Sequence, residues 1–132
     1  MSELDNAKAN IKEMEEGKAK ASQLLQYAND QVRDVTAMLN GIAERMNSHN
    51  AAWRDLPLEG IEEWAIEGAK LEHVYSAIKR KMREASQTRD ELTREVSQWE
   101  NGRVGAVNEL RLIEKYPDPI RRDAVRLFVM MK

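Results

Sequence analysis

Apolar residues recur along two long stretches of this chain with a spacing that alternates between three and four positions. In the longer stretch, one series advances by sevens from Ile61 to Leu110 and another from Trp64 to Ile113, and thirteen of their sixteen positions are apolar. The exceptions are Gly68, Arg89 and Arg103. A stripe with this repeat faces a partner helix along the seam of a coiled coil. The pattern therefore predicts one long helix over about residues 58–115.

The N-terminal part of the chain carries the same repeat. Its two series begin at Leu4 and Ala7, and twelve of their fourteen positions up to His49 are apolar. Ser2 stands where a helix prefers an N-cap, because its hydroxyl can accept a hydrogen bond from a backbone N–H of the first turn. We therefore expect a first helix over residues 3–47.

A linker over about residues 48–57 is expected between these two helices. The sequence Asn-Ser-His-Asn at its start favours a turn, and Pro57 disfavours helical backbone for the residue before it. Trp53 lies in this linker, and we interpret it as an apolar plug over the open end of the helix pair. The alternative is that Trp53 anchors a protein partner.

Two further interruptions lie closer to the C-terminus. An Asn-Gly pair could break the second helix at residues 101–105, but the heptad crosses this stretch without a change of phase, so we expect a continuous helix. The sequence Tyr-Pro-Asp-Pro then ends it. Asp118 is suited to be the N-cap, and Pro119 the first helical residue, of a short last helix over residues 119–131.

The two long helices are expected to pair as a hairpin, because a short linker joins them and favours an antiparallel arrangement. The predicted fold class is all-α: a long antiparallel coiled-coil hairpin with a short C-terminal helix. The register that best places small residues opposite large ones pairs Ile42 with Gly68. The alternative register is displaced by one heptad and places Ala28 opposite Tyr75.

The preferred register leaves Leu110 and Ile113 beyond the start of the first helix. We therefore consider two roles for the last helix: it covers these two residues, or it docks in a groove of another chain. Contact with a membrane surface is a third, weaker alternative. The candidate residues for partner binding or oligomerisation are Ile120, Ala124, Leu127, Phe128 and Met131.

Further apolar residues lie beside the two seams. They are Leu24, Tyr27, Met38, Ile66, Val74, Val104, Val107 and Leu112. A two-helix hairpin buries one stripe on each helix, so a broader apolar surface indicates additional neighbours, as in a three- or four-helix bundle. We therefore expect a homo-oligomer or assembly into a larger particle, with the chain itself or another protein as the partner.

Composition and charge exclude several classes of function. The 132 residues have a formal net charge of −2, which argues against a bulk polyanion binder. The absence of cysteine excludes disulfides and thiolate metal sites and fits a reducing compartment. No signal peptide and no apolar run long enough to span a membrane are recognisable. We expect a cytoplasmic protein, or a virion protein if the chain is a phage component.

The sequence contains no recognisable motif for catalysis or for binding a cofactor. The two histidines, His49 and His73, are expected to be surface or loop-end residues, and neither belongs to a metal-binding pair such as Glu-x-x-His. No glycine-rich phosphate loop is recognisable. We therefore predict that the protein is not an enzyme and has no catalytic residues, no metal site and no cofactor.

A basic cluster of Lys79, Arg80, Lys81 and Arg83 is the strongest alternative signal. Such residues could contact the phosphates of a nucleic acid or an acidic protein. On a helix, however, they spread around the solvated outer face, and Glu84 dilutes their charge. No aromatic residue alternates with them, so base stacking by a single strand is not indicated.

The sequence thus favours a non-enzymatic structural or assembly protein that oligomerises and presents its last helix to a partner. A component of a phage or of another large complex would fit this description, because such components are often short, helical and free of cysteine. The second hypothesis is a nucleic-acid-associated accessory factor that uses the basic helix face. The third is an adaptor or chaperone that holds a partner helix.

Overall fold

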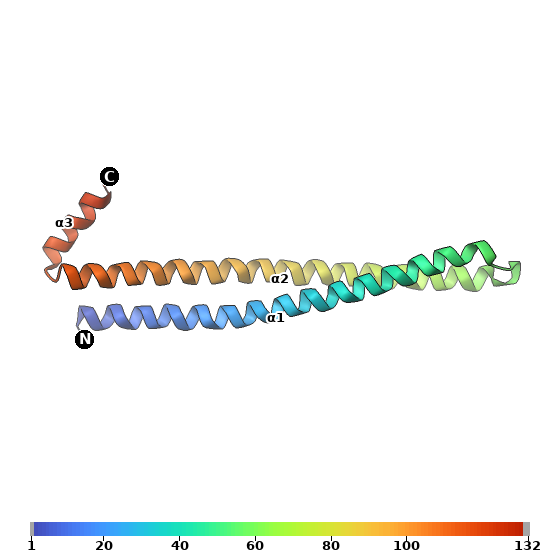
Figure 1. Ribbon diagram of the computed structural model, residues 1–132, viewed down its shortest axis with the longest axis horizontal. Helices are drawn as coiled ribbons and strands as arrows, with labels where there is room; N and C mark the ends of the chain where they lie inside the picture. Colours follow the sequence, from blue (N-terminus) through green and yellow to red (C-terminus); the bar gives the residue numbers. More distant parts are fainter. Residues whose placement is uncertain (1, 131–132) are drawn as a thin grey trace. The chain divides into compact units, whose positions relative to one another are not determined.

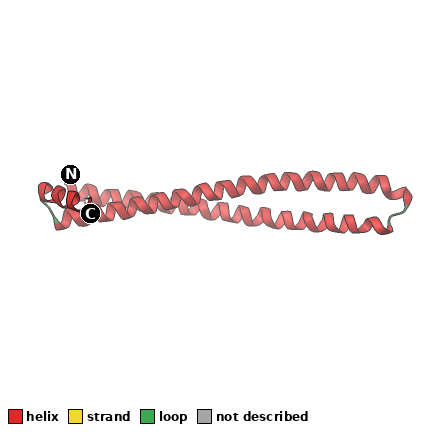
Figure 2. Ribbon diagram, turned by 90° about the horizontal axis from the view of Figure 1, so that it is seen from above, coloured by secondary structure: helices red, strands yellow, loops and turns green. Residues whose placement is uncertain are grey.

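The computed structural model of this chain describes residues 2–130, and nearly all of them are helical (Figure 1). No strand occurs among these residues, and Figure 2 shows two long helices joined by a short turn. The elements in chain order are α1 Glu3–Ala51, the 3-10 helices η1 Ala52–Asp55 and η2 Leu58–Gly60, α2 Ile61–Lys115 and α3 Pro119–Met130. The all-α helical hairpin predicted from the heptads is confirmed.

Both predicted N-caps are present. The backbone N–H of Asp5 donates to Ser2 Oγ over 3.1 Å, and that of Ile120 donates to Asp118 Oδ1 over 3.0 Å. These side chains satisfy amides of the first helical turn that have no partner inside the helix. α2 continues without a break across residues 101–105, as the unchanged phase of the heptad predicted.

The contacts of the chain group it into two compact units. The terminal unit consists of Met1–Leu24 and Leu92–Lys132, and the turn unit consists of Leu25–Glu91. The buried apolar residues are Ala28, Ile42 and Ile78 in the turn unit and Ala21, Ala106 and Ile113 in the terminal unit. All six are heptad positions, so each unit is built around the seam that a pair of helices buries.

In the turn unit, the register of α1 against α2 differs from the predicted one by one heptad. The prediction placed Ile42 opposite Gly68, but the ring of His49 lies there, and a Cβ built on Gly68 would be 2.7 Å from His49 Cε1. Further along, Thr36 Oγ1 lies 3.8 Å from Met82 Sδ. The alternative register is displaced in the opposite direction, so both predicted registers are wrong.

The turn explains this shift. α1 continues to Ala51, and one further step of its two heptad series reaches Trp53 and Leu56. The ring of Trp53 packs on Trp64 with centroids 4.9 Å apart, and Leu56 Cδ1 lies 3.3 Å from a Cβ built on Gly60. The seam therefore extends into the predicted linker. Trp53 packs at the end of the helix pair as predicted, although 53% of its surface stays exposed.

The terminal unit shows the same one-heptad shift. The ring of Trp99 lies over Gly17, where a Cβ would be 2.6 Å from the ring, and Met14 Sδ lies 3.0 Å from a Cβ built on Gly102. This register brings the start of α1 level with the end of α2, and Ile113 is only 8% exposed. The overhang that the last helix was expected to cover is therefore absent.

Candidate functional site

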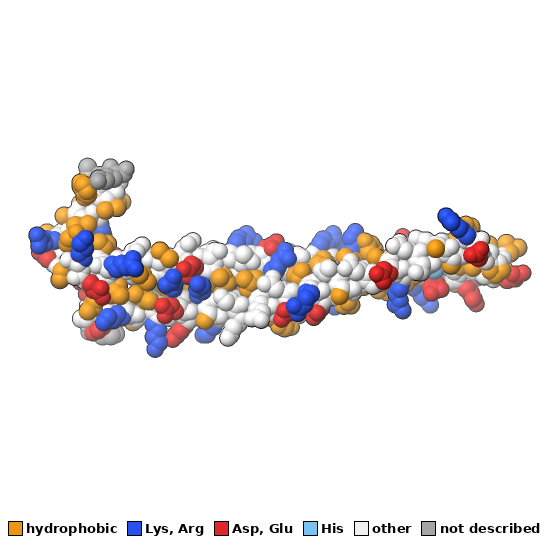
Figure 3. Space-filling model, in the orientation of Figure 1, with side chains coloured by type: hydrophobic (Ala, Val, Ile, Leu, Met, Phe, Trp, Pro, Cys, Tyr) orange, Lys and Arg blue, Asp and Glu red, His pale blue; other side chains and the backbone are white. Residues whose placement is uncertain are grey.

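α3 exposes most of its apolar side chains (Figure 3). Four of them lie three or four positions apart and so share one side of the helix. We call this set the α3 stripe, and its members are Ile120, Ala124, Leu127 and Phe128. Ile120 is 80% exposed, Leu127 63% and Phe128 59%. These are four of the five partner-binding residues expected from the sequence, and the fifth, Met131, lies outside the described residues.

A buried arginine holds the opposite side of α3. Arg122 is 2% exposed, and its guanidinium binds both carboxylate oxygens of Glu3, with Nη2 donating to Oε2 over 3.0 Å. Its Nε and Nη2 also donate to the carbonyls of Tyr116 and Pro117, each over 3.1 Å. Because guanidinium–carboxylate pairs of this two-pronged kind are directional, they fix orientation as well as position. α3 is thereby tied to the first turn of α1 and to the connector that precedes α3.

The surrounding charges reinforce this anchor. The hydrogen bond from Arg122 lowers the pKa of Glu3, and the hydrogen bond to Glu3 raises the pKa of Arg122. A second arginine, Arg126, forms salt bridges with Glu109 of α2 and Asp123 of α3. Both arginines are therefore engaged by carboxylates within the terminal unit.

A second charged cluster joins α1 to α2 in the terminal unit. Lys18 Nζ lies 2.8 Å from Glu100 Oε2, and Arg103 donates to both oxygens of the same carboxylate over 3.0 Å and 2.8 Å. The hydrogen bonds from Arg103 and then from Lys18 lower the pKa of Glu100 to about 2. Lys18 and Arg103, which both occupy seam positions, thus share one acidic partner, and this partner links the helices across the seam.

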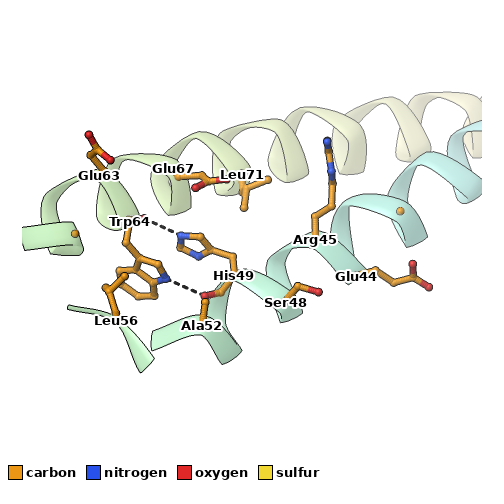
Figure 4. Close-up of a pocket in the computed structure, with 12 residues that line it drawn as sticks. Glu44, Arg45, Ser48, His49, Ala52, Leu56, Glu63, Trp64, Glu67 and Leu71 are labelled. Carbon is orange, nitrogen blue, oxygen red and sulfur yellow. Dashed lines mark hydrogen bonds between the residues drawn. The ribbon is translucent and has the colours of Figure 1, made fainter. Parts of the chain in front are cut away.

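The turn unit contains a reciprocal contact between His49 and Trp64 (Figure 4). Their rings stack with centroids 4.5 Å apart and an interplanar angle of 8°. Trp64 Nε1 donates to the His49 carbonyl over 2.8 Å, and His49 Nε2 donates to the Trp64 carbonyl over 2.7 Å. The expectation of a surface or loop-end histidine is corrected here, because His49 is half-buried between the helices.

An open groove of about 840 Å³ lies beside this contact, between the end of α1 and the start of α2. We call it the turn groove. Figure 4 shows Trp64 in the space between the helices, with Leu56 and Ala52 near its ring. Sequence reasoning missed the groove, although the small residues Gly41 and Ser48 of α1 and Ala52 at the start of η1 lie on one side of the chain. The residues that line it include Gly41, Glu44, Arg45, Ser48, Ala52, Glu63, Trp64, Glu67 and Leu71.

The four residues of the basic cluster do not all lie on one side of α2. Lys79 and Arg83 line one shallow hollow, whereas Lys81 lines a separate one beside Asp34. Arg80 is exposed on α2 and lines neither hollow. A nucleic-acid backbone is usually bound along a continuous basic stripe, so this division weakens the case for phosphate contact.

Within residues 2–130, no group of His, Cys, Asp or Glu side chains is placed to hold a metal ion. The described helices include none with the length and apolar character needed to cross a membrane. Comparison with known proteins finds no matching family model, no matching curated protein and no matching solved structure.

Proposed function

We propose that this chain is a non-enzymatic structural protein that assembles through α3. The hairpin acts as the support, and the α3 stripe binds a neighbouring chain in the way that an amphipathic helix lays its apolar face into a groove. We propose that the neighbouring chain is another copy of this protein. Contacts of this kind, repeated from copy to copy, would build a larger complex from this small chain.

The contrast between the two sides of α3 is the observation that supports this proposal. One side carries Arg122, which is 2% exposed and bound to Glu3, while the other side leaves Ile120 and Leu127 80% and 63% exposed. Clustered apolar side chains on a surface mark interaction sites. Because salt bridges hold α3 in place before any partner arrives, binding does not have to order the helix, and the entropic cost of association is smaller.

A competing route to assembly uses the long helices. Tyr27, Met38, Ile66 and Val74 of the turn unit are 63%, 55%, 50% and 45% exposed. All four belong to the apolar residues that flank the seams, and side-by-side packing of two hairpins into a bundle would bury such residues. Assembly through these four residues and assembly through the α3 stripe are therefore distinguished by changing each surface in turn.

Absolute molar mass from light scattering separates the two routes. The double variant Ile120→Glu/Leu127→Glu places charges in the α3 stripe without changing Arg122, and the matched variant Tyr27→Glu/Met38→Glu places the same charges on the turn unit. We expect the first variant to fall to the mass of one chain, 15.2 kDa, and the second to keep the mass of the unchanged protein. The reverse pattern would show that the long helices drive assembly.

A further inference from the structure

We propose that the α3 stripe of one copy docks in the turn groove of a second copy. This inference rests on the proposed function, because it takes α3 as the assembly element, and it adds the surface that receives α3. Shape, apolar character and charge each support the pairing of these two surfaces.

The turn groove can admit a helix at close range. Nothing lies within 4 Å of a Cβ built on Gly41, so another backbone can approach α1 closely at this residue. Ser48 and Ala52 continue the same lining toward the turn. The stretch from Gly41 to Ala52 measures about 16 Å, and α3 measures about 18 Å, at about 1.5 Å of rise per residue. The length of α3 therefore matches the length of the groove.

Apolar groups line the groove where the α3 stripe would reach it. Trp64 and Leu71 contribute to the wall formed by α2, and Figure 4 shows both side chains directed into the space between the helices. On the docking helix, Ile120 and Leu127 lie two turns apart on one side, which is the spacing of anchors in helix-in-groove recognition. Ala124 lies between them, so the middle of the helix is small enough to approach α1 closely.

The charges of the two surfaces are complementary. Glu44, Glu63 and Glu67 line the groove against a single Arg45, which leaves an excess of acidic groups. None of these four side chains forms a salt bridge with another described residue. On α3, Arg121 is exposed and likewise has no salt-bridge partner among the described residues. Docking would give Arg121 an acidic partner at the groove rim, and such complementarity favours the correct encounter.

This contact has a direct consequence for the form of the assembly. The two surfaces are different, so the interface is heterologous, and each added copy brings a further α3 stripe and a further turn groove. Such contacts extend as a filament or close as a ring. A single helix in a groove buries less than the roughly 1,600 Å² of a standard interface, so we expect a molar mass that rises with concentration.

The test mixes two variants that each lack one of the surfaces. Ile120→Glu/Leu127→Glu removes the α3 stripe, and Gly41→Trp fills the turn groove from a position where a built Cβ meets nothing within 4 Å. Each variant alone is expected to stay at 15.2 kDa, and an equimolar mixture to reach twice that mass, because one intact stripe and one intact groove remain. Gly105→Trp, at a second glycine where a built Cβ meets nothing within 4 Å but which does not line the groove, is the matched control and should assemble like the unchanged protein.

A charge exchange provides a second test that keeps the shape of the groove. Glu63→Lys is expected to weaken assembly about tenfold, and Arg121→Glu in the same chain to restore it. Glu62→Lys is the matched control, because Glu62 lies in the same first turn of α2 but does not line the groove. Equal effects of the two lysine variants would argue against a contact at the rim.

The outcomes separate this inference from the proposed function. If Gly41→Trp has wild-type helicity and assembles like the unchanged protein, or the mixture stays at the mass of one chain, the groove is not the receiving site. The proposed function still stands in that case, provided that Ile120→Glu/Leu127→Glu alone loses mass. If the unchanged protein never exceeds 15.2 kDa, docking between copies is overturned.

Discussion

The imidazole of His49 occupies the space that a side chain at Gly68 would need, since a Cβ built on Gly68 would lie 2.7 Å from His49 Cε1. Stacking on Trp64 and a hydrogen bond to the Trp64 carbonyl hold the ring in this position. Glycine in a helix interior is otherwise less stable than alanine by about 1 kcal/mol. The pairing of α1 with α2 in the turn unit therefore depends on the absence of a side chain at residue 68.

The effect of Gly68→Ala on the free energy of unfolding is expected to have opposite signs with and without the His49 side chain. In the unchanged protein it should destabilise the fold by about 1–3 kcal/mol, because the new methyl group displaces a packed ring. In the His49→Ala background the space is empty, and the same change should stabilise the helix by up to about 1 kcal/mol. Urea unfolding of the four proteins measures this coupling. The same effect in both backgrounds would contradict the contact.

Gly17 and Gly41 offer a matched pair of glycines in one helix. A Cβ at Gly17 would lie 2.6 Å from the ring of Trp99, whereas one at Gly41 would meet nothing within 4 Å. Gly41→Ala is therefore expected to stabilise the protein by about 1 kcal/mol, and Gly17→Ala to destabilise it by about 1–3 kcal/mol. Thermal unfolding followed by circular dichroism compares the two. Stabilisation by both alanines would show that Trp99 does not pack on Gly17.

Arg122 and Arg121 are neighbours with opposite surroundings. Arg122 is buried against Glu3, and Arg121 is exposed. Arg122→Ala is expected to speed amide hydrogen exchange throughout α3 while the long helices keep their protection, because the ties to α1 and to the connector are lost. Arg121→Ala should leave the exchange of α3 unchanged, provided that exchange is measured on the monomer. Similar exchange in both variants would mean that Arg122 does not anchor α3.

The Glu100 cluster predicts a loss of stability at low pH. Its hydrogen bonds lower the pKa of Glu100 from 4.5 to about 2 in the folded protein. A carboxyl group with a lowered folded pKa stabilises the fold above its unfolded pKa, and this contribution is lost as the pH falls through the folded value. The unfolding free energy should therefore decrease between about pH 4.5 and pH 2, and Glu100→Gln should reduce that decrease. Glu16→Gln, which removes an exposed carboxylate of the same unit, is the control for the change of charge, and equal effects of the two variants would contradict the Glu100 cluster.

The heptads predicted the helices and their pairing but not their register. A seven-residue repeat makes registers that differ by one heptad nearly equivalent along the seam, so the choice depends on contacts at the end. Here the end is the turn, where Trp53 packs on Trp64. Extending the first-helix series by one step into the predicted linker reaches Trp53 and Leu56, and that extension was the available signal.

The exposed side of α3 could be predicted, whereas its anchor could not. The spacing of Ile120, Leu127 and Phe128 on a short helix is visible in the sequence alone. By contrast, nothing in the sequence distinguishes Arg122 from Arg121 and Arg126, the other arginines of the same helix. It becomes buried only because Glu3, which is 119 residues away in the chain, lies beside the connector in the folded structure. The turn groove escaped prediction for the same reason, since its walls come from both helices and depend on the register.

Light scattering over a wide range of protein concentrations measures assembly through α3 most directly when the full chain is compared with a chain that ends at Tyr116. The full chain should exceed 15.2 kDa and increase in mass with concentration, while the shortened chain should keep the mass of a single copy throughout. If the two chains show the same degree of association at every concentration, α3 is not the element that joins the copies.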